Sequence, residues 1–249
     1  MSILKAIKDF GRDAAVGARE VWFPMQCCHC DRRLPAGTRD LCIRCRSELV
    51  TLDLHQLPEN IVTDLFWGRL PVERAACLLP YGGDAPVKRL MWRLKYDNRP
   101  DIGLRLGAWL GRLMDESDTF GDTDVIVPVP LHPRRLQKRG YNQAERIAAG
   151  IAESTGGLCL PHAVRRTRHT QTQTKKSRFE RMANMDDVFE LSRARSRGLQ
   201  TPASLIHGKH VVLVDDVMTT GATLGALGRA VLKAQPASLK VATLALARK

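Results

Sequence analysis

Val211-Val-Leu-Val-Asp-Asp-Val-Met-Thr-Thr-Gly-Ala-Thr223 is the stretch that decides the fold. Four consecutive apolar residues bounded by polar ones are typical of a strand that is buried on both faces, as in a parallel sheet. After Gly221, the apolar residues Leu224, Leu227 and Ala230 follow at helical spacing. The stretch therefore predicts a strand, a turn and a helix, with the turn at the carboxyl end of the strand.

The predicted turn has the composition of a phosphate site. Ligands of open α/β sheets bind at the carboxyl ends of strands, where a helix start offers unpaired N–H groups and a positive dipole end. Threonines within 219–223 add hydroxyl donors, and Gly221 lets the backbone approach an anion closely. Asp215 and Asp216 would repel a phosphate, so we expect them to accept hydrogen bonds from sugar hydroxyls or to approach Mg²⁺. The alternative is that no ligand binds here: the acidic pair only ends the strand, and the threonines cap the helix.

These thirteen residues resemble, over its whole length, the phosphoribosyl-diphosphate (PRPP) motif of type I phosphoribosyltransferases. The resemblance implies that Asp215 and Asp216 bind the ribose hydroxyls and that residues 219–223 surround the 5′-phosphate. The PRPP-binding residues that it implies in this stretch are Val217, Met218, Thr219, Thr220, Gly221, Ala222 and Thr223. A Walker A loop is excluded, because no Gly-Lys-Ser/Thr follows.

Charge is unevenly distributed along the chain. The 249 residues can hold one α/β core and a small appendage, and 39 Lys and Arg against 26 Asp and Glu give a net charge of +13. Twelve basic and three acidic residues lie within 134–181, so this segment carries nine of the thirteen net charges. It predicts a polyanionic partner, which could be diphosphate, single-stranded DNA or both. The alternative is a solubilising surface, although such a surface usually interleaves the two signs.

The amino terminus has no secretory or membrane-spanning pattern. No apolar run approaches the ~20 residues that span a bilayer, and Asp9 and Asp13 interrupt any signal-like segment. Apolar residues within 3–10 have helical spacing and predict a short helix that packs onto its own domain, with a membrane-surface or partner helix as the alternative. We expect a cytoplasmic protein that is not transmembrane and whose thiols stay reduced.

Two Cys-x₂-Cys pairs, Cys27 with Cys30 and Cys42 with Cys45, predict a metal site. Pairs at this separation can fold back and present four thiolates tetrahedrally, as structural Zn²⁺ requires. Four thiolates leave no position for water, so the site is expected to be structural rather than catalytic. Iron–sulfur ligation and a redox pair are the alternatives.

Cys28 and His29 lie between the first two ligands and could replace them, although we expect them to be bystanders. The amino-terminal segment has few apolar residues, so zinc would stabilise it in place of a core. We expect an amino-terminal helix and zinc-knuckle domain over 1–68 and a phosphoribosyltransferase-like domain over 69–249.

A second strand–turn–helix pattern is predicted upstream. A strand over 125–130 leads into the basic turn 131–142 and a helix over 143–154. Strand, basic turn and helix again form an anion-binding arrangement, with an exposed basic loop as the alternative.

A weaker strand near 158–164 precedes the polar, basic run 165–181. This run suits a mobile lid that closes over a charged substrate. A last strand over 238–246 follows the helix over 224–234. The fold predicted from this order is α/β: a parallel twisted sheet flanked by helices, with right-handed crossovers.

Several further motifs resemble the ComF family of competence-associated, phosphoribosyltransferase-like proteins. They are Lys95-Tyr96, Val127-Pro-Val-Pro-Leu-His-Pro-x-Arg-Leu-x-x-Arg-Gly-Tyr-Asn-Gln143, Arg166-x-Arg-x-Thr-x-x-Gln173, Arg181-x-x-Asn184 and Phe189. The resemblance covers most of the chain, including the four cysteines, and departs mildly at Tyr141, where the family often has Phe. It implies a link to DNA uptake in natural competence and indicates no particular acceptor base.

The resemblance also implies a mechanism. The ribose C1 of PRPP passes through a cationic state while diphosphate leaves, so the leaving group needs charge neutralisation more than the reaction needs a protein nucleophile. Backbone N–H groups near Leu131 to Arg134 would bind diphosphate, Mg²⁺ would bridge diphosphate and ribose oxygens, and the lid would exclude water. The catalytic residues implied are Asp215, Asp216, Arg134 and Arg135. Further PRPP contacts are Leu131, His132 and Lys95, and the flexible-loop residues are Arg166, Arg168, Gln173, Arg181 and Asn184.

Three functions remain open from the sequence. The first is a transferase that moves or exchanges phosphoribosyl groups. The second is a non-catalytic, PRPP-sensing factor that binds single-stranded DNA through 134–181. The third is a zinc-knuckle adaptor that docks on a helicase or nuclease of the uptake machinery. Diphosphate release favours the first, and DNA affinity that falls steeply with salt favours the second.

Overall fold

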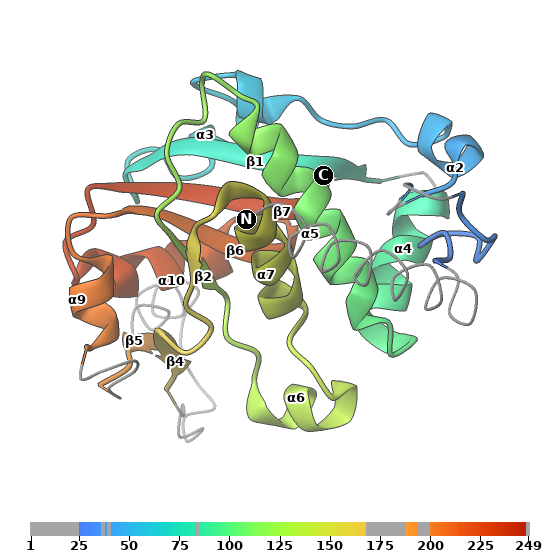
Figure 1. The fold of residues 1–249 in the computed structure, drawn as a ribbon. Helices are drawn as coiled ribbons and strands as arrows, with labels where there is room; N and C mark the ends of the chain where they lie inside the picture. Colours follow the sequence, from blue (N-terminus) through green and yellow to red (C-terminus); the bar gives the residue numbers. More distant parts are fainter. Residues whose placement is uncertain are drawn as a thin grey trace, which may run out of the picture. The chain divides into compact units, whose positions relative to one another are not determined.

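A computed structural model of the chain describes residues 25–35, 38, 41–82, 85–167, 188–193 and 200–247 (Figure 1). The chain divides into two compact units, Met1–Leu49 and Val50–Lys249. The helix expected within residues 3–10 lies outside the described residues. None of the described helices is long and apolar enough to cross a bilayer.

The described residues of the first unit form a small hairpin-like turn and one short helix. Gln26 and Arg33 form an antiparallel bridge, and the Cys27 N–H donates to the Arg32 carbonyl at 2.9 Å. Asp31 has a positive φ of 59°, which closes the turn between the bridged residues. The helix is α2 (Ile43–Ser47), with Cys42 at its N-cap. Each Cys-x₂-Cys pair is therefore held by a separate piece of local structure.

The second unit begins earlier than the sequence predicts, since the expected domains were 1–68 and 69–249. Leu54, Val62 and Phe66 belong to the same buried cluster as the strands of the sheet. These residues belong to η1 (Leu54–Gln56), to α3 (Ile61–Asp64) and to the turn that follows α3. The segment from residue 50 to 68 is thus part of the α/β core, because its apolar side chains are buried there.

Five described strands form a sheet in the order β1-β7-β6-β2-β3, and every neighbouring pair is parallel. They are β1 (Val72–Tyr81), β2 (Val125–Pro128), β3 (Leu158–Cys159), β6 (His210–Met218) and β7 (Ser238–Ala247). The central strands are buried in continuous runs, as expected for a sheet covered on both faces. The predicted parallel sheet flanked by helices is confirmed.

Right-handed crossovers place the helices on two faces. The connections from β1 to β2 and from β2 to β3 advance in one direction across the sheet, and those from β3 to β6 and from β6 to β7 run back. The advancing connections carry α4 (Ala85–Tyr96), α5 (Pro100–Asp115) and α7 (Gln143–Thr155), and the returning ones carry α9 (Pro202–Ile206) and α10 (Ala222–Leu232). Figure 1 shows α5 and α7 together on the near face of the sheet.

This topology creates a switch point between β6 and β2. The two strands are neighbours, but the chain leaves β6 towards β7 on one side and leaves β2 towards β3 on the other. A crevice forms at the carboxyl ends of such strands, where open α/β folds bind their ligands. The two strand–turn–helix patterns singled out in the sequence therefore meet at one edge of the sheet.

Some elements differ from those predicted. The expected strand over 158–164 is divided between β3 and β4 (Val164–Arg166), and β4 pairs with β5 (Phe189–Leu191) in a separate antiparallel sheet. The expected basic turn contains the helix α6 (Pro133–Arg139). Pro133 at the first turn and a left-handed Gly140 at the end give α6 a start and a stop.

Candidate functional site

The acidic pair lies at the end of β6 and still within the strand, since the ladder with β7 continues to Met218. Asp215 pairs in register with Thr243, and the Asp216 N–H donates to Asp215 Oδ1 at 2.8 Å. Both carboxylates are half-buried. Successive residues of a strand point to opposite faces, so Asp215 and Asp216 present their oxygens on different sides of the strand end.

Lys95 forms an ion pair with this acidic pair. Its Nζ lies 3.1 Å from Asp216 Oδ2, and the side chains of Lys95 and Asp216 are only 23% and 15% exposed. Burial and then the neighbouring Asp216 charge raise the pKa of Asp215 to about 7, against the opposing effects of the Asp216 N–H and Lys95. A carboxylate with a raised pKa at a strand end, next to a lysine, is the kind of perturbed group found at ligand sites.

A set of contacts holds Lys95 at this position. The Tyr141 hydroxyl donates to the carbonyl of Leu94, which is the residue before Lys95 in α4. The Arg139 guanidinium lies over the Tyr96 ring, 5.2 Å from its centroid. The Lys95-Tyr96 and Arg-Gly-Tyr-Asn motifs are thus one structural group, although neither periodicity nor composition could have paired them.

Asn142 ties this group to the end of β2. Its Nδ2 donates to the Val129 carbonyl at 3.0 Å, while its Oδ1 accepts from the Ala144 N–H at 3.1 Å and caps α7. The side chain therefore fixes the start of α7 against the residue that follows β2. This explains in physical terms why an Asn is placed between the basic helix and α7.

The hydroxyl-rich turn connects β6 to α10. Thr219 and Thr220 are exposed, and Gly221 is the N-cap of α10 with a left-handed φ of 70°. The Phe66 ring covers this glycine so closely that a Cβ there would lie 2.9 Å from Phe66 Cζ. Position 221 therefore requires glycine for two reasons, its backbone conformation and its contact with Phe66.

A hollow of about 500 Å³ adjoins the turn. Its lining includes Thr219 and Thr220 on one side and Ile61, Leu65 and Arg69 on the other. Hydroxyls, one guanidinium and apolar side chains therefore face a common space at the end of β6. The contribution of the segment around α3 to this hollow was not predicted, because it depends on contacts between segments that are distant in the sequence.

The predicted diphosphate-binding residues lie on α6 and at its start. His132 is the N-cap, and its Nδ1 accepts from the Arg134 N–H at 3.2 Å, while the Arg135 N–H donates to the His132 carbonyl at 2.8 Å. Pro133 has no N–H. In this conformation the Arg134 N–H donates to the His132 side chain and is not free for an anion, so one donor of the expected cradle is engaged. The exposed side chains of Arg134 and Arg135 carry the positive charge.

The base of the predicted lid is the two-stranded sheet of β4 and β5. Arg166 lies 5.6 Å from the centroid of the Phe189 ring, and Arg165 forms an ion pair with Glu190. Burial and the nearby Arg135 charge lower the pKa of Arg166. The structure thus brings Arg166 near Arg135 of α6. The other predicted lid residues lie outside the described residues: Arg168, Gln173, Arg181 and Asn184.

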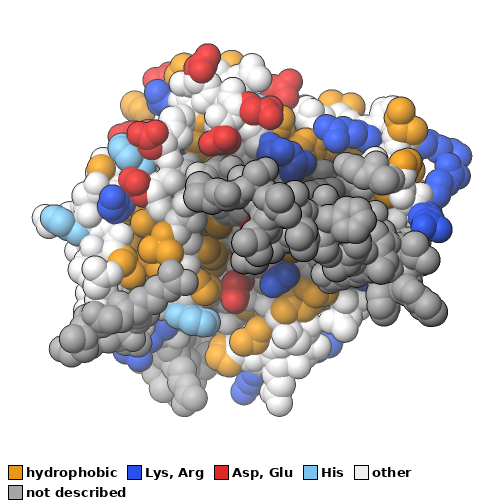
Figure 2. Space-filling model, in the orientation of Figure 1, with side chains coloured by type: hydrophobic (Ala, Val, Ile, Leu, Met, Phe, Trp, Pro, Cys, Tyr) orange, Lys and Arg blue, Asp and Glu red, His pale blue; other side chains and the backbone are white. Residues whose placement is uncertain are grey.

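The exposed cations of α6 are interleaved with apolar groups. Over α6, in the lower part of Figure 2, Lys and Arg side chains lie beside hydrophobic ones. Leu136 in this helix is itself exposed. The surface near the strand ends can therefore contact both phosphates and apolar groups.

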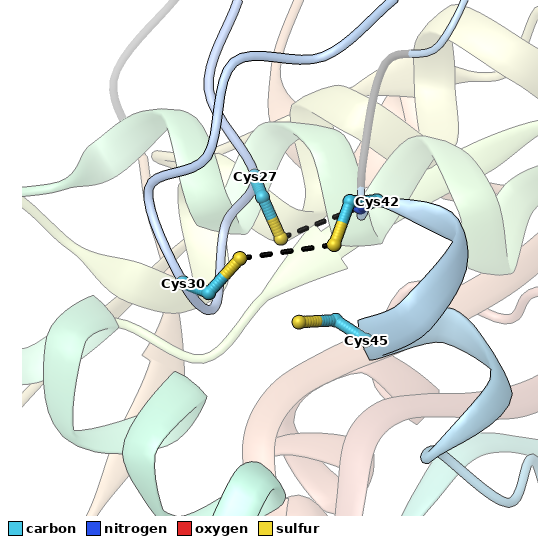
Figure 3. A group of neighbouring side chains, drawn as sticks. All are labelled: Cys27, Cys30, Cys42 and Cys45. Atoms are coloured by element: carbon cyan, nitrogen blue, oxygen red, sulfur yellow. Dashed lines mark hydrogen bonds between the residues drawn. The ribbon is translucent and has the colours of Figure 1, made fainter.

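The predicted metal ligands converge in the first unit. The thiols of Cys27, Cys30, Cys42 and Cys45 point towards one another (Figure 3), and their sulfur atoms all lie within 4.8 Å of one another. The Sγ atoms of Cys30 and Cys42 are 3.7 Å apart, which is close to the roughly 3.8 Å edge of a tetrahedron with metal–sulfur bonds of about 2.3 Å. The donor set therefore fits a tetrahedral metal ion.

Local hydrogen bonds favour a thiolate at this cluster. Burial raises the pKa of the Cys27 thiol, but the backbone N–H groups of Cys30, Cys42 and His29 outweigh it and lower the pKa to about 7. The Cys42 N–H lies 3.3 Å from Cys27 Sγ. Cys28 is buried outside the group of four, and His29 Nδ1 lies 3.3 Å from Cys45 Sγ, where it can hydrogen-bond a ligand.

Comparison with known proteins assigns the family. Residues 105–249 match the phosphoribosyl transferase domain family. The chain is 30% identical to DNA utilization protein YhgH of Escherichia coli K12 over 174 residues, which are 69% of this chain and 71% of that protein. It is 29% identical to Competence protein F of Haemophilus influenzae over 151 residues, 59% of this chain and 62% of that protein. The chain belongs to the ComF family.

This ComF-family chain also matches a YhgH protein of another organism and a solved structure. It is 31% identical to YhgH of Salmonella typhi over 159 residues, which are 63% of this chain and 65% of the length of that relative. Among solved structures, it is similar to the glutamine PRPP amidotransferase from B. subtilis complexed with ADP and GMP. That similarity has a TM-score of 0.41 at 20% identity and covers 61% of this chain and 30% of that one.

Proposed function

We propose that this ComF-family chain binds PRPP with Mg²⁺ at the carboxyl ends of β6 and β2 and transfers or exchanges its phosphoribosyl group. The proposal rests on the arrangement of side chains at the end of β6. Asp215 and Asp216 lie beside Lys95, and the turn that follows enters α10 through exposed threonines. Carboxylates for sugar hydroxyls and a helix start for a phosphate are thereby held a few residues apart.

In this proposal each part of the substrate has its own partner. The ribose 2′- and 3′-hydroxyls donate to Asp215 and Asp216. The 5′-phosphate accepts from the hydroxyls of Thr219, Thr220 and Thr223 and from the first N–H groups of α10, which have no partner within the helix. Val217, Met218, Gly221 and Ala222 supply the backbone of the same turn.

The diphosphate is proposed to face the basic residues across the crevice. The side chains of Arg134 and Arg135 on α6 and of Arg166 on β4 supply positive charge, and Leu131 and His132 border the end of β2. When the C1–oxygen bond breaks, its electron pair leaves with diphosphate, and these cations stabilise the charge that develops. The acceptor then forms the new bond to C1. Lys95 would leave Asp216 for the incoming phosphates as the ribose takes its place.

Two metal ions belong to the proposal. Asp215 and Asp216 offer oxygen ligands that suit hydrated Mg²⁺, which would neutralise phosphate charge when it arrives with PRPP. The four cysteines would hold a structural Zn²⁺, since their sulfurs fit a closed tetrahedral site with no position for water.

Calorimetric titration and a diphosphate assay test the proposal. PRPP should bind the metal-loaded chain in the presence of Mg²⁺ and much more weakly with EDTA. Adding candidate bases to the bound state should release diphosphate for at least one acceptor class. Binding without diphosphate release would favour the non-catalytic, PRPP-sensing role, and absence of binding would contradict both.

Single-stranded DNA binding is a second candidate function. It is favoured by the excess of basic residues in segment 134–181, of which the structure describes residues 134–167, with Arg166 of β4 near Arg135 of α6. The names of the relatives, DNA utilization protein and Competence protein, point the same way. The affinity for DNA should fall as the salt concentration rises. Replacing Arg134, Arg135 and Arg166 by Gln should make the slope of log K against log salt shallower by roughly 2, at about 0.7 per lost phosphate contact. An unchanged slope would assign these charges to diphosphate or solvent. A helicase or other uptake component would then be the remaining candidate partner.

A further inference from the structure

Helix α4 exposes two aromatic rings on an otherwise ordinary amphipathic helix. Leu90, Met91 and Leu94 are buried, while Trp92 and Tyr96 are 55% and 59% exposed. The two aromatic residues are four positions apart, so they share one face of the helix. Leaving two large rings in water forgoes the stabilisation that their burial would give, which makes an exposed pair informative.

The two rings form one surface. Their centroids are 6.1 Å apart and their planes are inclined by 45°. The Arg139 guanidinium of α6 lies over the Tyr96 ring, at 5.2 Å from the centroid. A hollow of about 460 Å³ adjoins the pair and is also lined by Lys88 and Lys95. Flat apolar faces, a hollow and cations are therefore contiguous.

The charge around the rings has one sign. The sequence of α4, Ala-Pro-Val-Lys-Arg-Leu-Met-Trp-Arg-Leu-Lys-Tyr, contains no acidic residue. Arg93 is paired with Asp97, and Lys95 with Asp216. Within the part of the chain that the structure describes, Lys88 and Arg89 are exposed and have no carboxylate partner. These two cations are available to a negatively charged ligand.

We propose that the aromatic face of α4 binds single-stranded nucleic acid, with bases stacking on Trp92 and Tyr96 and phosphates on Lys88 and Arg89. The inference rests on the second candidate function and goes further by assigning the contacts with bases to α4 rather than to the basic segment. Stacking platforms combined with a basic track are how proteins bind single strands without reading their sequence. Arg139 links the two surfaces, because it belongs to the basic segment and covers Tyr96.

The geometry favours a single strand over other occupants. A duplex hides the faces of its bases inside the stack, so it could offer only phosphates to this surface. An apolar protein surface would leave Lys88 and Arg89 without counter-charge. From Lys88 to Tyr96 the helix rises about 12 Å, at about 1.5 Å per residue, so the face has room for a few nucleotides.

Anisotropy titrations of the full, metal-loaded chain with a fluorescein-labelled oligo(dT) test the proposal. Trp92→Leu keeps an apolar, helix-forming side chain but removes the ring. It should weaken binding by about 5- to 150-fold, the range for losing one stacked base, without changing the salt slope. Trp92→Tyr should retain most of the affinity. Trp67→Leu is the matched control, because Trp67 is 87% exposed but lies outside α4.

Two further measurements separate stacking from charge. Replacing both Lys88 and Arg89 by Gln should make the slope of log K against log salt shallower by about 1.4. An abasic strand of the same length should bind wild type and Trp92→Leu equally.

Three outcomes would overturn the proposal. If Trp92→Leu and Trp67→Leu bind oligo(dT) alike, the rings do not stack on bases. If Trp92→Leu loses a protein partner and keeps its DNA affinity, the face is a protein-docking site. If wild type binds no single strand at all, the second candidate function fails together with this inference. Circular dichroism of each variant confirms that α4 still folds.

Discussion

The two units of this chain fill their interiors with different chemistry. Of the seven buried apolar side chains described before residue 50, four are cysteines and three are leucines. After residue 50, the buried cluster consists of Val, Leu, Ile, Phe and Ala, with one Cys and one Met, from the sheet and the helices on its faces. Burial of apolar area can stabilise the second unit, whereas the described part of the first buries few apolar side chains. In our proposal, metal–thiolate bonds stabilise the first unit instead. One chain can therefore lose one unit's structure and keep the other's.

Removing the metal should give the largest effect. Cys42→Ser, or a strong chelator, should unfold residues 25–49, because structural zinc contributes about 10–16 kcal/mol of binding free energy to small domains at neutral pH. The strands of the second unit should stay protected. Hydrogen exchange read separately for residues 25–49 and 72–81, together with metal analysis, measures both.

Cys159→Ser is the matched control for this experiment. Cys159 lies on β3, outside the group of four, so the variant should bind the same one zinc per chain that we propose for the wild type. Protection of residues 25–49 in metal-free protein would remove the distinction between the two units.

Truncating a core side chain should affect only the second unit. Phe66 is 2% exposed and covers Gly221. Phe66→Ala should lower the free energy of unfolding by about 3–5 kcal/mol, through lost burial and the cavity that it leaves, while zinc content is unchanged. Denaturant unfolding of metal-loaded protein measures this. Trp67→Ala, next in sequence but exposed, should change stability by no more than about 0.5 kcal/mol; equal effects would mean that Phe66 is not a core residue.

Changes in the strand-end site should affect ligand binding more than stability. Asp216→Asn keeps the size of the side chain and removes its charge, so PRPP binding should weaken by about 1.5–3 kcal/mol, the range for hydrogen bonds to charged groups. Thr220→Ala should cost near ~1 kcal/mol, because neighbouring N–H groups still hold the phosphate. Calorimetric titration of the folded, zinc-loaded variants with PRPP measures both losses of binding free energy. If Thr220→Ala weakened PRPP binding more than Asp216→Asn, binding would depend more on one phosphate contact than on the ribose contact of Asp216.

Acid should act on the two units by different routes. In the first, protons compete with the metal for thiolates. In the second, burial lowers the pKa of His55, against the opposing charges of Asp53 and Glu116. Unfolded His55 takes up a proton near pH 6.5, whereas the folded protein does so only at lower pH. The unfolded state therefore binds more protons in between, and the free energy of unfolding should fall as the pH drops below about 6.5.

His55→Gln tests the second route. The variant lacks the titrating group, so its free energy of unfolding should depend less on pH below 6.5, by up to about 1.4 kcal/mol per pH unit. Urea unfolding at several pH values gives the slope. The same slope in both proteins would assign the acid sensitivity to other groups.

Local pattern was sufficient to predict the ends of β6 and β2. Continuous apolar runs followed by special turns predicted both strands and the helices α7 and α10, but not α6, which lies within the expected basic turn. The two Cys-x₂-Cys pairs predicted a cluster that the structure brings together. These features depend on neighbouring residues, which is why sequence alone predicts them.

Contacts between distant segments were beyond local pattern. Strand β1 contains the buried apolar run 75–79, but its place at the edge of the sheet depends on pairing with β7, the last strand of the chain. Resemblance placed Lys95 in the site, but its pairing with Asp216 depends on where α4 ends. The division of 158–164 between two sheets depends on pairing with residues after 188.

Hydrogen exchange with and without PRPP and Mg²⁺ tests the central claim, that the substrate sits at the end of β6. The account predicts that the amides of residues 215–223 become strongly protected on adding both ligands, and that neither the cysteine cluster nor the opposite, amino-terminal ends of the strands change. Protection elsewhere, with 215–223 exchanging as in the free protein, would contradict it.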